Sequence, residues 1–400
     1  MSIFRNGPLA IICLAALALS ACATPTRLAP EPAYSMPQAS AGIPNVRFLV
    51  ARDTSAFQAE ALSALAKEKA WRAAQGATGE LPPAYYLAIS GGGDNGAFGA
   101  GFLNGWTASG SRPEFKVVTG VSTGALIAPF AFLGPRYDGA LERFYTAISP
   151  KDVFKTRGMI KGVTGDGMAD TAPLAKLIAR NTDQALLGAI AAEYAKGRVL
   201  LVGTANLDSL EPVVWNMTAI AASKSANALQ LFRSVLLASA SIPGAFPPVM
   251  IDVTVDGQHF QEMHADGGTT AQVFVYPPSV DARLFQQAAP RRRVLYILRN
   301  ARLDAPWKQV PRKTMTIAAR AIDSLTTTQG IGDLYRIFAA TQRDGIEFNL
   351  AYIPSSFRPH PDKQFDTGYM RELFAFGRNA AADGRYAWQN SPPGFERPVH

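Results

Sequence analysis

The chain has 400 residues, of which 48% are hydrophobic and 18% are charged. This balance is typical of a globular protein with one large core or two modest ones, and it excludes a chain that is disordered throughout. The 39 Lys and Arg residues and the 31 Asp and Glu residues give a net charge of +8, but no basic stripe is interleaved with aromatic residues, so we expect no nucleic-acid partner.

The first 21 residues have the pattern of a secretory signal peptide. Arg5 is their only charged residue, and the apolar run 9–19 is short for a membrane-spanning helix. The stretch "LSAC" that follows, at 19–22, resembles a bacterial lipobox, in which the cysteine is lipidated and becomes the mature N-terminus. We therefore expect cleavage before Cys22 and a lipid anchor on Cys22.

The use of cysteine agrees with this anchor. The only two cysteines are Cys13, inside the segment that would be removed, and Cys22, so the mature chain would have no disulfide. Several acyl chains hold a protein on a membrane more firmly than one chain does. Ala23 stands directly after the lipidated position, and the resemblance to lipoproteins without an aspartate there implies the outer membrane of the bacterial envelope.

Two short segments precede the main domain. Residues 22–45 are rich in proline and small polar residues, which predicts an extended tether. Residues 46–83 form an N-terminal helical segment, because the stretch 54–75 has helix-forming composition and apolar residues that can share one face.

From residue 84 onward, strand-like and helix-like stretches alternate. This alternation predicts an α/β fold with a central, mostly parallel sheet that is flanked by helices on both faces. Residues 301–400 are expected to be a C-terminal, mostly helical extension that packs on the same domain. The expected strands are 84–90, 115–120, 198–207, 211–217, 293–300 and 346–353, and the expected helices are 96–109, 123–132, 172–195, 226–240, 313–345 and 364–388.

A glycine-rich stretch, "SGGGDNGAFGAG" at 90–101, follows the first of these strands and begins a helix. Gly91, Gly92 and Gly93 allow consecutive backbone N–H groups to turn inward and form an anion-binding concavity. The same stretch also matches the dinucleotide fingerprint G-x-G-x-x-G, but no acidic residue ends a second strand about twenty residues later. We therefore favour an oxyanion-binding loop.

The sequence "GVSTG" at 120–124 lies between an expected strand and an expected helix. This placement fits a nucleophile elbow, in which Ser122 occupies a strained turn while Gly120 and Gly124 leave room for neighbouring backbone. The helix that follows points its positive end at the site, where it can stabilise an oxyanion. A plain glycine-rich turn is the alternative reading of this stretch alone.

Two kinds of general base remain open for Ser122. A Ser-His-acid triad needs a histidine, and His264 and His360 are its candidates among the four histidines of the chain. Alternatively, Asp266 stands before two glycines in "HADGG", where the backbone can approach closely. A carboxylate there could accept the serine proton directly if it is dry and within hydrogen-bond reach.

Taken together, these stretches resemble the patatin-like phospholipases. The glycines 91–93 are similar to the oxyanion hole of that family, Ser122 lies at the nucleophile position and Asp266 at the aspartate of the D-G-G or D-G-A motif. The stretch "ASASIPGAFPPV" at 238–249 is similar to the proline-rich segment between them. The resemblance covers residues 84–300 and implies a three-layer patatin-like fold, a Ser-Asp dyad and neither metal nor cofactor.

Two positions depart from that family's usual pattern. Asn95 stands where an arginine or lysine is usual, and Ser90 stands where an aspartate is frequent. The missing cation weakens the case for a phosphate-bearing substrate more than the case for ester hydrolysis.

The function expected from these observations is that of a lipid-anchored serine acyl hydrolase. It would cleave acyl esters of phospholipids or lysophospholipids through an acyl-enzyme, with the amides of Gly92 and Gly93 holding the oxyanion. The alternative from a different class is a non-catalytic envelope lipoprotein that keeps the hydrolase scaffold for binding or assembly.

Overall fold

The structure is a computed structural model that describes residues 27–30, 41–77, 79–158, 162, 165–304 and 307–395. The expected signal peptide, the lipidation position Cys22 and most of the expected tether lie outside these residues. Among the described residues, no helix has both the length and the apolar character that a membrane span requires.

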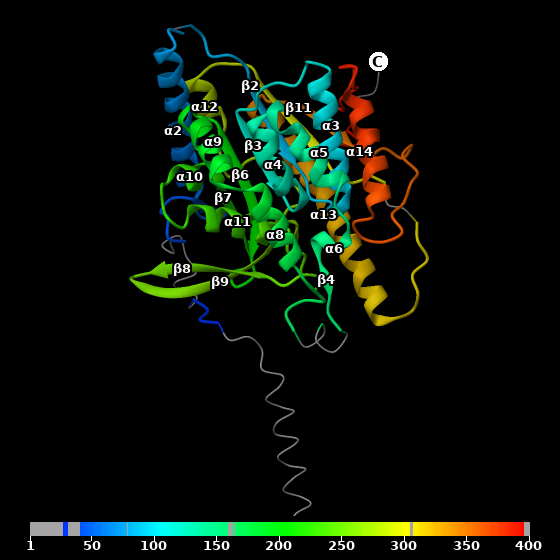
Figure 1. Cartoon of the computed structure of the whole chain (residues 1–400). Helices are drawn as coiled ribbons and strands as arrows, with labels where there is room; N and C mark the ends of the chain where they lie inside the picture. The colour runs from blue at the N-terminus through cyan, green and yellow to red at the C-terminus, as the bar shows by residue number, and fades with distance from the viewer. Residues whose placement is uncertain are drawn as a thin grey trace, which may run out of the picture.

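A large mixed sheet organises the described part of the chain (Figure 1). Its strands run in the order β1-β7-β6-β3-β2-β10-β11, and the hairpin β8–β9 joins through the pairing of β9 with β6. The five strands from β6 to β11 are mutually parallel, whereas β1, β7 and β9 pair in antiparallel fashion. The strands are β1 (Arg47–Leu49), β2 (Ala84–Ile89), β3 (Val117–Val121), β6 (Val199–Asn206), β7 (Glu211–Asn216), β8 (Val249–Val255), β9 (Gln258–Asp266), β10 (Arg293–Arg299) and β11 (Glu347–Tyr352); β4 (Lys155–Thr156) and β5 (Ala169–Asp170) pair separately.

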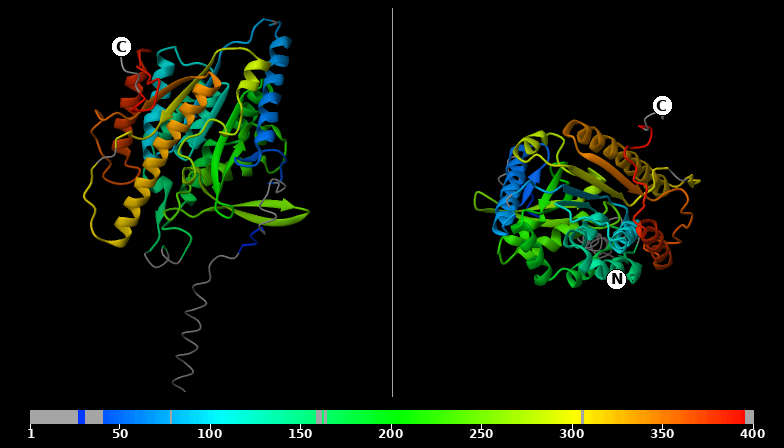
Figure 2. Two further views of the ribbon diagram at one scale, coloured as in Figure 1. Left: turned by 180° about the vertical axis from the view of Figure 1, so that it is seen from behind. Right: turned by 90° about the horizontal axis from the view of Figure 1, so that it is seen from above.

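Helices cover both faces of the sheet and complete three layers (Figure 2). One face carries α3 (Gly96–Ala108), α4 (Thr123–Leu133), α5 (Asp138–Thr146), α8 (Ala172–Asn181), α9 (Gln184–Ala195), α10 (Met217–Ala222), α11 (Ala228–Ser239) and α14 (Thr367–Ala381). The opposite face carries α2 (Thr54–Ala74), α12 (Arg283–Ala288) and α13 (Thr314–Asp344). The short α6 (Pro150–Val153) packs near α8. The predicted α/β architecture with a largely parallel central sheet is therefore confirmed.

The two faces of the sheet are packed differently. On the α3–α4 face a single continuous hydrophobic core includes Phe98, Phe102, Ile127 and Trp215. On the α2–α13 face the buried apolar residues fall into two smaller clusters, one against α13 and one against α2. Alternate residues of each strand point to opposite faces, so both clusters and the large core share the same strands.

The segments outside residues 84–300 pack onto this sheet. Strand β1 adds an edge beside β7, and β11 extends the parallel order beyond β10. Of the expected tether, Arg27 forms an ion pair with Asp208, and the carbonyl of Leu28 accepts a hydrogen bond from the N–H of Gln261. This short piece therefore contacts the body of the protein.

Helix α13 carries exposed apolar side chains in its first half. Ile317, Ile322 and Leu325 are 52%, 51% and 70% exposed, and Trp307, just before the helix, is 86% exposed. Exposed cationic side chains lie in the same segment: Lys308, Arg312 and Lys313. Residues 300–304 follow β10 at its carboxyl end, and Figure 1 shows the beginning of α13 at the same end of the molecule as the β8–β9 hairpin.

Candidate active site

Ser122 lies at the turn between the parallel strand β3 and helix α4. Its φ of 55° is in the left-handed region, where a residue with a Cβ is strained. A Cβ at Gly120 would lie 2.4 Å from the carbonyl oxygen of Gly124, and one at Gly124 would lie 2.2 Å from that of Ile89. Both glycines are therefore needed for the close approach of strand and helix, as expected of a nucleophile elbow.

Asp266 ends strand β9 and faces Ser122 across the sheet edge. Its Oδ2 accepts a hydrogen bond of 2.6 Å from the Ser122 hydroxyl, and its Oδ1 accepts one of 2.7 Å from the N–H of Gly268. Ser122 is 7% exposed and Asp266 is 5% exposed. The structure thus brings together the two residues that the sequence proposed as nucleophile and base, although they are 144 positions apart.

Burial raises the pKa of Asp266 from 3.8 to about 7, although the hydrogen bonds from Ser122 and Gly268 act in the opposite direction. A carboxylate in a dry site resists ionisation because its charge loses the solvation of water. A base is most useful when its pKa lies near the working pH. At neutral pH Asp266 is therefore poised to exchange a proton with the serine hydroxyl.

The glycine loop after β2 lies beside this pair. Gly91 contributes differently from the expectation, because its N–H donates a 3.0 Å hydrogen bond to the carbonyl of Gln272 and is used within the fold. Within the described part of the chain, the N–H groups of Gly92 and Gly93 have no hydrogen-bond partner, and Gly93 lines the same cavity as Ser122. The candidate oxyanion donors are thus Gly92 and Gly93, with Gly91 anchoring the loop.

Asn300, just beyond the end of β10, holds this loop in place through three hydrogen bonds. Its N–H donates to the Ser90 hydroxyl at 2.8 Å, its side-chain amide donates to the Ser90 carbonyl at 2.9 Å, and its Oδ1 accepts from the N–H of Gly99 at 3.0 Å. A Cβ at Gly92 would lie 2.1 Å from the Asn300 carbonyl oxygen. Ser90, which stands where the family often has aspartate, is thereby a fixed part of the loop.

Ser239 supports the elbow in a similar way. Its hydroxyl accepts a 3.0 Å hydrogen bond from the N–H of Ser122 and donates one of 2.7 Å to the carbonyl of Gly203. Neither Asn300 nor Ser239 was predicted from the sequence as a positioning residue. Their only signal in the sequence is that each polar residue ends an apolar strand or helix, which is too common to single them out.

Asn95 and its neighbour Asp94 connect the glycine loop to the C-terminal segment. The Asn95 Oδ1 accepts a 2.6 Å hydrogen bond from the Tyr369 hydroxyl, and the Asp94 carboxylate accepts one of 3.1 Å from the N–H of Phe365. At the position where the family usually carries a cation, this chain therefore has a neutral amide that is tied to α14.

His264 is buried on β9, but both ring nitrogens have partners other than Ser122. Nδ1 lies 3.0 Å from the Thr204 hydroxyl and Nε2 lies 3.1 Å from the Glu262 carboxylate, which also pairs with Arg47. Burial is the main cause that lowers the pKa of His264. His360, the other candidate base, is exposed in a loop. The geometry favours Asp266 over either histidine as the base.

An apolar cavity opens beside Ser122. Its lining includes Leu126, Ile148, Leu174 and Phe246, together with Gly93 of the glycine loop. The cavity has a volume of about 30 Å³, and its apolar lining suits the aliphatic part of an ester next to the serine. The described residues contain no group of three or more His, Cys, Asp or Glu side chains placed to hold a metal ion.

Residues 87–277 match the family model described as patatin-like phospholipase. This part of the chain belongs to the patatin-like phospholipases. The resemblance stated from the sequence is thus confirmed, and the domain is that of a lipid acyl hydrolase. Within it lie the glycine loop, the elbow and Asp266, whereas Asn300 and Tyr369 lie beyond its end.

Solved structures give two further comparisons. The crystal structure of VipD from Legionella pneumophila is 9% identical, with a TM-score of 0.37, and the match covers 76% of this chain and 67% of that chain. Human GIVD cytosolic phospholipase A2 is 10% identical, with a TM-score of 0.29, and the match covers 80% of this chain but only 55% of that chain. No curated protein matches the chain.

Proposed function

We propose that the protein is a serine acyl hydrolase that cleaves acyl esters of phospholipids or lysophospholipids through a Ser122–Asp266 dyad. The observation that carries this proposal is the 2.6 Å hydrogen bond between the buried Ser122 hydroxyl and the Asp266 carboxylate. The membership of residues 87–277 in the patatin-like phospholipases supplies the lipid class of the substrate.

The reaction follows from the placement of these groups. The Ser122 Oγ attacks the ester carbonyl while its proton passes to the Asp266 Oδ2, and the carbonyl π electrons move onto oxygen. The N–H groups of Gly92 and Gly93, with the amino end of α4, stabilise this oxyanion. The alcohol then leaves with the proton held by Asp266, and an acyl ester of Ser122 remains.

Water completes the cycle by the same route in reverse. Asp266 takes a proton from a water molecule, which attacks the acyl-enzyme at its carbonyl carbon and forms a second oxyanion at the same donors. The collapse of this intermediate expels the Ser122 oxygen, which recovers its proton from Asp266. The products are the fatty acid and an alcohol or lysolipid, and no other group has to enter the balance.

The proposed location is the bacterial outer membrane, through a lipid on Cys22. Support beyond the lipobox comes from the segment before and within α13, where exposed Trp307 and Leu325 accompany exposed lysine and arginine side chains. Apolar and cationic side chains together favour contact with an anionic lipid surface. An enzyme held at such a surface stays beside a water-insoluble substrate.

The test is to measure acyl release from a chromogenic ester and from phospholipid vesicles by the chain and two variants. Ser122→Ala and Asp266→Asn should each lose about 10³-fold or more in kcat/KM, because nucleophile and base act as one unit. The matched controls are Ser234→Ala on α11 and Asp252→Asn on β8, which lie away from the dyad and should keep full activity.

A folded parent protein without activity on any ester, and without labelling of Ser122 by a fluorophosphonate, would instead support the alternative of a non-catalytic envelope lipoprotein. Full activity in Ser122→Ala would exclude the dyad.

A further inference from the structure

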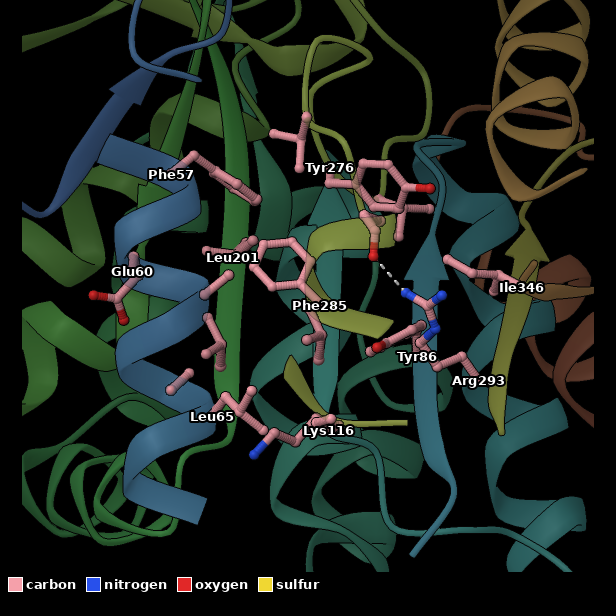
Figure 3. A pocket seen from close by; sticks show the side chains of 18 of the residues that line it. Phe57, Glu60, Leu65, Tyr86, Lys116, Leu201, Tyr276, Phe285, Arg293 and Ile346 are labelled. Atoms are coloured by element: carbon pink, nitrogen blue, oxygen red, sulfur yellow. Dashed lines mark hydrogen bonds between the residues drawn. The ribbon is translucent and has the colours of Figure 1, made fainter. Parts of the chain in front are cut away.

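A second cavity lies on the opposite face of the sheet from Ser122. It lies between α2, α12 and the first halves of β2, β3 and β6 (Figure 3), is partly open to solvent, and has a volume of about 130 Å³. One water requires about a tenth of that volume. The cavity shares no lining residue with the one beside Ser122.

The cavity exists because this face of the sheet is incompletely packed. The cluster around α13 and the cluster around α2 do not merge, and helix α2 buries only Ala64, Leu65 and Glu68 of its 21 residues. Most of the cavity wall is apolar, including Phe57, Leu201 and Phe285. A space of this kind suits an aliphatic ligand.

Arg293 gives the cavity its chemical selectivity. This arginine is 4% exposed and lines the cavity. Its guanidinium donates to two backbone carbonyls, those of Ala282 at 2.8 Å and Asp344 at 2.6 Å, but to no carboxylate. Its Nε is buried and has no hydrogen-bond partner among the described residues. A buried cation without a counter-ion is unfavourable, so an anion at this place would be stabilised.

The other charged groups of the cavity do not neutralise Arg293. Lys116 and Arg291 both pair with the single carboxylate of Glu68, at 2.7 Å and 2.8 Å. Glu60 accepts a hydrogen bond from the Tyr194 hydroxyl. Asp344, whose backbone carbonyl accepts from Arg293, has its carboxylate paired with Arg343 at 2.7 Å and hydrogen-bonded by the Tyr276 hydroxyl. The three cationic side chains that line the cavity, those of Lys116, Arg291 and Arg293, are therefore accompanied by two carboxylates, those of Glu60 and Glu68, and one positive charge is left over.

We propose that this cavity binds a single-chain aliphatic carboxylate, a fatty acid, with its chain along the apolar wall under α2 and its carboxylate at Arg293. Tyr86 lies beside Arg293 (Figure 3) and can donate a second hydrogen bond to the carboxylate. A carboxylate matches the geometry of a guanidinium and its charge. This site is separate from the dyad and does not depend on hydrolysis by Ser122.

The experiment is a calorimetric titration of the Ser122→Ala chain with decanoate and, separately, with decanol, the uncharged chain of equal length. We expect decanoate to bind at least tenfold more tightly than decanol. Ala61→Phe, which fills the cavity from α2, should abolish this binding. Arg293→Met should weaken decanoate at least tenfold and leave decanol nearly unchanged, and Tyr86→Phe should weaken decanoate severalfold.

The active-site cavity provides the matched control. Leu174→Phe narrows the space beside Ser122 and should leave the decanoate affinity of the second cavity unchanged. Equal affinities for decanoate and decanol in the parent, or undiminished decanoate binding in Ala61→Phe, would overturn the proposal. Because Ala61→Phe and Tyr86→Phe leave the hydrogen bonds of Arg293 in place, the test does not rest on a variant that loses its fold.

Discussion

Asp266→Asn is expected to make the protein more stable while it removes the activity. Ionised Asp266 is costly to bury, as its pKa of about 7 against an ordinary 3.8 indicates. Between these two values the unfolded chain has released the proton of this carboxyl and the folded protein still holds it. The unfolded state therefore binds fewer protons, and the free energy of unfolding falls as the pH rises through this window.

The size of the effect follows from the shift. The full shift of about three pKa units lowers the free energy of unfolding by about 4 kcal/mol at pH 8. At pH 5 the folded carboxyl is still protonated while the unfolded one is ionised, and about 2 kcal/mol of this loss has already occurred. Asparagine has no charge at either pH. It can still accept the hydrogen bond from Gly268, and its amide can donate to the Ser122 oxygen, so both contacts of the site persist.

The measurement is urea-induced unfolding of the parent and of Asp266→Asn at pH 8 and pH 5. The variant should be the more stable at both values, and its advantage should be about 2 kcal/mol larger at pH 8. Asp252→Asn, at an exposed position of β8, is the control and should show neither effect. An advantage that is absent at pH 8, or equal at both pH values, would contradict the assignment of a buried, proton-exchanging carboxyl.

The activity of the parent should depend on pH for the same reason. Only ionised Asp266 can accept the Ser122 proton, so kcat/KM should rise about tenfold per pH unit below pH 7 and level off above it. A flat profile between pH 5.5 and 8 for a soluble ester would show that another group, or none, acts as the base.

Three further changes test other parts of the site and surface. Gly92→Ala should lower kcat by about 10²-fold, as the loss of an oxyanion donor does. The new Cβ would lie 2.1 Å from the Asn300 carbonyl oxygen, so the loop must shift and its N–H groups move away from the oxyanion position. Unchanged turnover of a soluble ester would contradict this role. His264→Gln should keep activity within about tenfold but lower the free energy of unfolding by about 1–3 kcal/mol, since buried hydrogen bonds are lost; a collapse of activity in a folded variant would make this histidine the base. Trp307→Ser combined with Leu325→Ser should weaken sedimentation with anionic phospholipid vesicles while hydrolysis of a soluble ester stays unchanged, and equal sedimentation would exclude this surface as the membrane contact.

Much of the fold could be predicted because apolar runs and glycine positions are local signals. The expected strand 84–90 and helix 123–132 coincide with β2 and α4 within one residue. The expected helix 172–195 instead forms the two helices α8 and α9, which separate where Asp183 caps the second through a hydrogen bond to the N–H of Leu186.

The hairpin β8–β9 was missed, although the sequence contains its signal. Asp256 and Gly257, with φ values of 49° and 78°, form the tight turn between two strands of alternating burial. A two-residue Asp-Gly loop between such runs favours a hairpin. Because Asp266 ends β9, the missed hairpin is also the element that carries the proposed base to the serine.

The supporting contacts of the site could not be predicted in the same way. Asn300 contacts Ser90 across 210 positions and Ser239 contacts Ser122 across 117. No local pattern encodes such pairs, since they depend on which strand ends meet at the sheet edge. Gly91 shows the same limit, because its part in the loop depends on the position of the Gln272 carbonyl.

The strain at the proposed dyad and the dense packing behind it belong together. Ser122 is held at a φ of 55° and Asp266 is held in a dry site, and both arrangements cost free energy that relaxation of the turn would release. Relaxation is opposed because all eleven residues of α4 are buried and the N–H of Ser122 is tied to Ser239. On the other face of the sheet the packing leaves a cavity under α2. A small-to-large substitution in α4 that shifts the helix should therefore impair catalysis, because the turn at Ser122 relaxes. The free energy released by the strained backbone at Ser122 should offset part of the stability that the overpacked helix loses.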